Sequence, residues 1–196
     1  LQPGESVALV VLDEVSGLAF NPQVTLLESQ DALHYTTTLQ LRIGSVLKYR
    51  YLRQGTYTAQ EHLPAGQPVR YRLHHVVAQA TVSDLVSRWT DTPYTGATGR
   101  ILGSVTDEQT RQPIPGLLVT AGGRQTHTTA DGSYLLDGLP PGVHNLVVYA
   151  QDGAYQPFQQ GAVVAEGTAT PADITLVPAA FVDVTFVVAL PANTSP

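Results

Sequence analysis

Hydrophobic and polar residues alternate in short runs along the whole chain, and the runs are bounded by Gly, Pro, Asn and Asp. Alternation with a period of two is typical of β-strands that bury one face, and no stretch carries a sustained helical period with caps. The sequence therefore predicts an all-β protein. In the first half of the chain the predicted strands span residues 5–13, 23–28, 34–41, 46–53, 68–77 and 81–89.

The second half repeats this pattern at tighter spacing. Gly122-Gly123 and Asp131-Gly132 supply the positive φ angles that tight hairpin turns require. Seven short strands within about eighty residues are typical of a β-sandwich. The predicted strands here span residues 100–106, 117–121, 125–129, 133–136, 143–150, 156–164 and 172–176.

A segment rich in Thr, Pro and Gly at residues 91–99 separates the two halves and is the natural linker. The sequence thus predicts two β-sandwich domains in tandem, immunoglobulin-like or transthyretin-like, at residues 1–95 and 96–179. Residues 180–196 are predicted to form a C-terminal extra strand, either a donor strand or the first strand of a next domain. With 196 residues, each domain is large enough to bury its own core.

Composition narrows the function classes. The net charge is −6 and only ten residues are Lys or Arg, so no basic stripe exists to neutralise phosphates, and nucleic acid is excluded as a partner. No apolar run approaches the roughly 18 residues that span a bilayer, which excludes membrane insertion. The chain has no Cys and begins at Leu1 rather than Met, so we expect a processed chain or a piece of a longer one.

Four motifs in the second half carry a family resemblance. They are Gly99–Asp107, Pro113–Val119, Thr128–Tyr134 and Leu139–Gly142. Residues 99–178 resemble carboxypeptidase regulatory-like domains, which have a transthyretin-like sandwich fold. The resemblance implies a stabilising or spacing module of secreted proteins, with no catalytic residues to carry over.

The first half resembles starch-binding carbohydrate-binding modules over residues 1–95. The residues that carry this resemblance are Leu47–Arg53, Glu61, Val69–Arg72 and Val82–Trp89. Such modules open with an alternating strand that ends in a Pro and a Thr-containing turn, and this chain starts after that step. A matching strand stands instead at residues 182–194, so the order of the strands looks permuted.

One face of that last strand is apolar. The residues on it are Val182, Val184, Phe186, Val188 and Leu190. Three interpretations are open: the strand completes the second sandwich, it begins a further domain of a tandem array, or it fills the open first domain of another copy and builds a head-to-tail polymer. Return of the strand to its own first domain would give a monomer.

Catalytic and metal-binding patterns are missing from the sequence. The six His lack metal-ligand spacing, the adjacent acids Asp13-Glu14 and Asp107-Glu108 are typical of solvated turns, and no nucleophile elbow or phosphate loop occurs. We therefore expect no enzyme activity, no metal and no cofactor.

Sugar binding in starch-binding modules depends on exposed aromatic rings, and the resemblance suggests Trp89, Tyr49 and Tyr51 as glycan-binding residues; the alternative is that these rings pack the sandwich. Asn193 lies in a glycosylation sequon. The leading hypothesis is an extracellular or cell-surface structural protein whose C-terminal strand is donated to other copies of itself. The alternative is a carbohydrate-binding or spacer module of a secreted polysaccharide-degrading enzyme, with an α-glucan or another polysaccharide as its partner.

Overall fold

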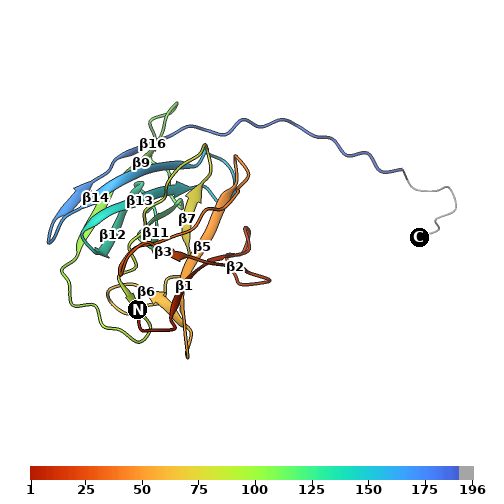
Figure 1. Cartoon of the computed structure of the whole chain (residues 1–196). Helices are drawn as coiled ribbons and strands as arrows, with labels where there is room; N and C mark the ends of the chain where they lie inside the picture. Colours follow the sequence, from red (N-terminus) through yellow and green to blue (C-terminus); the bar gives the residue numbers. More distant parts are fainter. Residues whose placement is uncertain (190–196) are drawn as a thin grey trace, which may run out of the picture.

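The computed structural model describes residues 1–189 of the chain, and this part consists of strands and irregular segments without a helix (Figure 1). The all-β fold class predicted from the alternation is confirmed. The strands of the first half are β1 (Ser6–Val11), β2 (Gln23–Leu26), β3 (Glu28–Ser29), β4 (Tyr35–Thr36), β5 (Val46–Gln54), β6 (Ala59–His62), β7 (Arg72–His75) and β8 (Arg88–Trp89). Those of the second half are β9 (Gly99–Asp107), β10 (Leu118–Ala121), β11 (Arg124–His127), β12 (Ser133–Leu139), β13 (Gly142–Tyr149), β14 (Phe158–Val164), β15 (Ala169–Pro171) and β16 (Ile174–Leu176).

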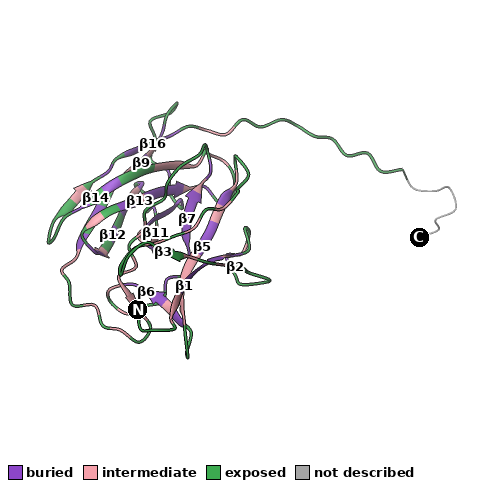
Figure 2. Ribbon diagram, in the orientation of Figure 1, coloured by how far each residue is buried: buried purple, intermediate pink, exposed green. Residues whose placement is uncertain are grey.

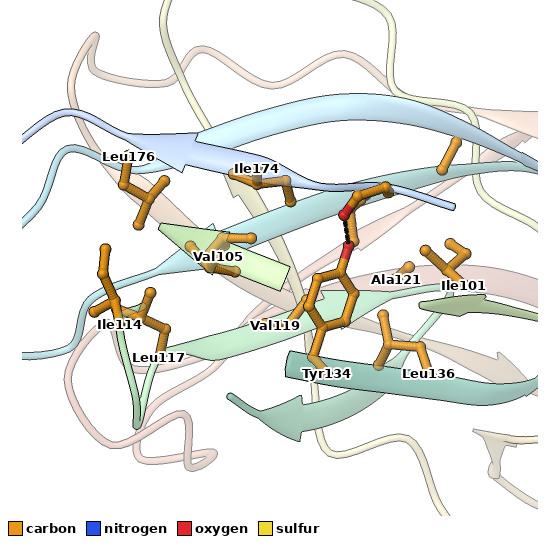
Figure 3. Close-up of a cluster of buried hydrophobic side chains, with 14 of the residues drawn as sticks. Ile101, Val105, Ile114, Leu117, Val119, Ala121, Tyr134, Leu136, Ile174 and Leu176 are labelled. Atoms are coloured by element: carbon orange, nitrogen blue, oxygen red, sulfur yellow. Dashed lines mark hydrogen bonds between the residues drawn. The ribbon is translucent and has the colours of Figure 1, made fainter. Parts of the chain in front are cut away.

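The second half is a sandwich of two sheets. One sheet has the order β11-β10-β13-β14, and the other has the order β12-β9-β15, with β16 also pairing with β9. Apolar side chains from both sheets form the core between them (Figure 3). Within this core the Tyr134 hydroxyl donates a 2.6 Å hydrogen bond to the main-chain oxygen of Ala172, which ties β12 to the segment between β15 and β16.

Two glycines of this sandwich are required by geometry. At Gly103, a Cβ atom would lie 2.0 Å from the main-chain oxygen of Ala172, so only glycine allows β9 to approach that segment. Gly132 adopts φ +75° in the predicted turn, where hydrogen bonds from Thr129 and Ser133 lower the pKa of Asp131 to about 2. The sequence predicted the turn at Gly132. The close approach at Gly103 has no local sequence signal and was not predicted.

The first half is built around one sheet with the order β2-β1-β5-β6-β8, in which β7 also pairs with β5. One face of this sheet packs on the outer face of β10 and β13. Leu118 and Val147 of the second half join Val10, Tyr71 and Leu73 of the first in a common buried cluster. The two halves are therefore layered sheet on sheet, and β10 and β13 are buried on both faces.

Two predicted strands are much shorter in the structure, and one strand of the structure was not predicted. Residues 34–41 form a strand only at β4, and residues 81–89 only at β8; both segments alternate in sequence but lack a neighbouring strand to bond with. Conversely, β6 was not predicted, because its inward residues are Ala59 and the charged Glu61 rather than an apolar pair.

The predicted C-terminal strand is also absent from the described residues 182–189, which run away from the body as an extended segment (Figures 1 and 2). A strand needs a partner for its main-chain groups, and this segment has none within the described part of the chain. Leu190 and Asn193, which the sequence assigned to the donor strand and to a glycosylation site, lie outside the described residues.

Candidate functional site

A groove of about 670 Å³ lies on the face of the first sheet that points away from the second half. Successive residues of a strand point to opposite faces, so the neighbours of the cluster residues Val10, Val46 and Leu73 form its floor. These floor residues come from β1, β5 and the β7 region: Leu9, Leu47, Tyr49, Tyr51, His74 and Val76. The first half therefore uses one sheet face for the second half and leaves the other over a groove.

Most of the remaining lining comes from two segments, residues 35–41, which begin with β4, and the irregular residues 78–82; Leu27 and Ile43 complete it. Within the described residues, the main chain of 37–41 and of 78–84 makes no hydrogen bond. Main-chain N–H and C=O groups are normally paired with one another or hydrated. Those of a segment without a neighbouring strand can pair with a strand of another chain. The layer that should cover this sheet face thus consists of two unpaired segments.

A buried ion pair holds one of these segments against the sheet. The guanidinium of Arg72 on β7 donates to Glu61 Oε2 at 2.8 Å and to Asp84 Oδ1 at 3.0 Å, and a further 2.9 Å bond reaches the main-chain oxygen of Leu85. Glu61 is fully buried and also accepts from the main-chain N–H of Tyr51 at 2.9 Å. Arg72 is 4% exposed, so this one side chain satisfies both carboxylates in the interior.

Asp84 also accepts from the two tyrosines of the floor. The hydroxyls of Tyr49 and Tyr51 donate to Asp84 Oδ2 at 2.7 and 3.0 Å. Burial, together with the negative charge of Asp84, raises the pKa of both phenols well above the ordinary value, so both stay protonated donors. The sequence resemblance named Glu61, Arg72 and Asp84, but only the structure shows that they form one network.

Tyr49 is 2% exposed, and its burial leaves no ring face for stacking on a sugar. Tyr51 packs edge-on against it, with ring centres 5.9 Å apart. Trp89 on β8 is half-buried, with the Arg53 guanidinium 6.0 Å from the centre of its ring. The structure brings Tyr49 and Tyr51 together but does not add Trp89 to the groove lining, and a glycan-binding role for Tyr51 and Trp89 stays a prediction.

His74 is the one floor residue with an unused polar atom among those described. It is 7% exposed, and its Nδ1 is buried without a hydrogen-bond partner. Burial lowers the pKa of His74, so its ring is neutral near neutral pH. The described residues contain no group of three or more His, Asp or Glu side chains that could hold a metal ion.

The extended C-terminal segment carries the complementary surface. Val182, Val184, Phe186 and Val188 are 85%, 66%, 87% and 80% exposed, whereas apolar stripes of this kind are normally buried. The last main-chain hydrogen bond to the body among the described residues runs from the Ala179 N–H to the Ala154 oxygen, at 2.9 Å. The chain thus has both an exposed apolar stripe and a groove with Leu9, Leu47 and Val76 on its floor.

Comparison with known proteins identifies the second sandwich. Residues 100–177 match the family model of the carboxypeptidase regulatory-like domain. This confirms the resemblance read from the four motifs of the second half. The matched region runs from the second residue of β9 to the residue after β16, and it ends before the extended segment. The described residues contain no helix long and apolar enough to cross a membrane.

Solved structures give only distant likenesses. A protein of Bacteroides uniformis that is provisionally described as carbohydrate-binding is 22% identical, with a TM-score of 0.34 over 42% of this chain and 43% of its own. A minor pilin of Streptococcus agalactiae is 13% identical, with a TM-score of 0.38 over 93% of this chain and 86% of its own. These low scores carry no argument about function. No curated protein matches the chain, and the likeness of residues 1–95 to starch-binding modules stays a prediction.

Proposed function

We propose that this chain is a structural subunit of the cell exterior that assembles head to tail by strand donation. The segment that starts at Val182 leaves its own body and fills the groove of the first domain of the next copy. The observation that supports this most strongly is the pairing of two open surfaces, the apolar stripe and the groove over Leu9, Leu47 and Val76. A contact between two different surfaces of one chain propagates into a filament unless it closes into a ring.

A comparison of the free energies of side-chain burial and chain ordering shows what such a junction requires. Burying the side chains of Val182, Val184, Phe186 and Val188 contributes roughly 6 to 12 kcal/mol at about 1.5 to 3 each. Ordering the seven residues 182–188 costs about 7 to 14 kcal/mol at roughly 1 to 2 per residue. The two effects are of the same size, so side-chain burial alone does not hold the junction. Main-chain hydrogen bonds to the acceptor have to supply the surplus.

Size-exclusion chromatography and electron microscopy of three purified chains test the proposal. Wild-type chain is expected to elute as a concentration-dependent series and to form filaments. Phe186→Asp places a charge in the apolar stripe and is expected to remain monomeric. Thr185→Asp adds the same charge on the opposite face of the strand and is the matched control, which should still assemble.

A wild-type chain that stays monomeric at high concentration would overturn the proposal. Assembly of Phe186→Asp to the same extent as wild type would overturn it as well, because the apolar stripe would then have no part in the contact.

A further inference from the structure

Two segments without main-chain hydrogen bonds, residues 37–41 and residues 78–84, flank the groove, and we call them its walls. Their position determines how a strand could enter the groove. We infer that the incoming strand is inserted between residues 37–41 and residues 78–84 and pairs with both, as a central strand of the missing covering sheet. This inference rests on the proposed function and specifies its acceptor site. It differs from addition to the free edge of an existing sheet.

Both walls have main-chain groups that are free to pair with a strand. Residues 37–41 and residues 78–82 line the groove, and the main chain of 37–41 and of 78–84 has no hydrogen bond within the described residues. A strand lying between them would bond with every one of its main-chain groups, whereas an edge strand uses only half of them. Since side-chain burial by itself does not hold the junction, two-sided pairing provides what is lacking.

The alternation of the donor segment fits a covering layer. The stripe from Val182 to Val188 would face the floor of the groove, while Asp183, Thr185 and Val187 on the other face would point to solvent. The network around Arg72 fixes Asp84 and Leu85 at the end of one wall, so this wall is held in place before the strand enters.

The free edge of β2 is the alternative acceptor. This strand pairs only with β1 in the main sheet, and Val24 and Leu26 on it are 49% and 56% exposed. No residue of β2 lines the groove, so a strand added at that edge would not bury its apolar stripe in the groove.

The occupant is the segment of a second copy. Ala179 is anchored to Ala154 in the second domain, and the three peptide units from Ala179 to Val182 span at most about 11 Å. A strand over the groove lies two sheet spacings from the sheet that contains β13, or about 20 Å. The first residue of the chain's own stripe therefore does not reach its own groove, whereas a second copy can place the whole stripe there.

Hydrogen–deuterium exchange with mass spectrometry tests the mode of entry. Full-length Phe186→Asp chain, which has an intact groove and a defective donor, is measured alone and with an excess of a synthetic peptide of residues 180–196. A peptide that carries the same Phe186→Asp change is the control. Exchange at residues 37–41 and at residues 78–84 is expected to slow at least tenfold with the wild-type peptide and to stay unchanged with the control peptide.

The outcomes separate this inference from the proposal on which it rests. If the peptide binds but protects only one wall, or protects residues 23–26 instead, insertion between the walls is overturned while donation stands. If the peptide does not bind at all, the proposed function itself fails, and the inference fails with it.

Discussion

The side-chain amide of Gln125 in the second domain donates a 2.8 Å hydrogen bond to the main-chain oxygen of Tyr71, just before β7 in the first. Asn145 does the same to the oxygen of Leu73 at 3.1 Å, and the N–H of His75 donates to Gln159 Oε1 at 2.9 Å. Alternate residues of this edge thus find polar partners on the neighbouring domain. With the apolar cluster beside them, these bonds make the two halves one unit.

The first prediction follows from this coupling. Val147 is fully buried in the cluster between the domains, so Val147→Asp places an unpaired carboxylate there at a cost of several kcal/mol. Calorimetry should show one cooperative transition in wild type and two separate transitions in the variant. Val143→Asp is the control on the same strand, at a residue 62% exposed, and should leave a single transition. Two transitions in the wild type would contradict the coupling.

Breaking the buried ion pair should be costly. Glu61→Gln keeps the shape of the side chain but leaves Arg72 with one carboxylate fewer, and loss of one partner of a buried pair typically costs about 3 to 5 kcal/mol. Urea unfolding measures this loss in the free energy of unfolding. Glu108→Gln, at an exposed position, should change it by less than about 0.5 kcal/mol. Equal effects of the two substitutions would show that the network contributes nothing.

Stability should fall in mild acid. Burial lowers the pKa of His74, His75 and His144 below the ordinary value of 6.5, so between 6.5 and the lowered values the unfolded chain binds more protons than the folded one. Their contribution is fully present above pH 6.5 and declines as the pH falls from there. Urea midpoints at about pH 7.5 and pH 5.5 test this expectation.

Comparison of His144→Gln with His127→Gln isolates one of these groups. His144 is 2% exposed and its Nε2 lies 2.7 Å from the Pro140 oxygen, whereas His127 is exposed. The first substitution should flatten the decline and the second should leave it as in wild type. An unchanged midpoint in wild-type protein between the two pH values would refute the expectation.

The second domain was largely predictable from its sequence, and the covering layer of the first was not. Turns such as Asp131-Gly132 fix each hairpin locally, so the strands follow from nearby residues. Residues 81–89 show the same alternation, yet most of them lack a strand partner, and pairing is a property of the whole chain. Alternation alone therefore predicted a strand where the structure has an unpaired wall.

Only part of the candidate site could be predicted from the sequence. The apolar stripe from Val182 to Val188 is local and was read directly, but the groove depends on segments more than thirty residues apart. The pairing of Glu61 with Arg72 likewise needs the fold. One signal was present and not used: the apolar run in β13 at residues 146–148 is typical of a strand buried on both faces, and it marks the contact between the domains.

A mixture of two defective chains tests strand donation most directly. Phe186→Asp leaves the groove intact and disables the donor, while Leu47→Arg places a charge on the half-buried groove floor and leaves the donor intact. Each chain alone should sediment as a monomer in analytical ultracentrifugation. An equimolar mixture should form one junction per pair, and therefore a dimer and nothing larger. A mixture that remains monomeric, or that forms filaments, would contradict donation of the C-terminal strand to the groove of another copy.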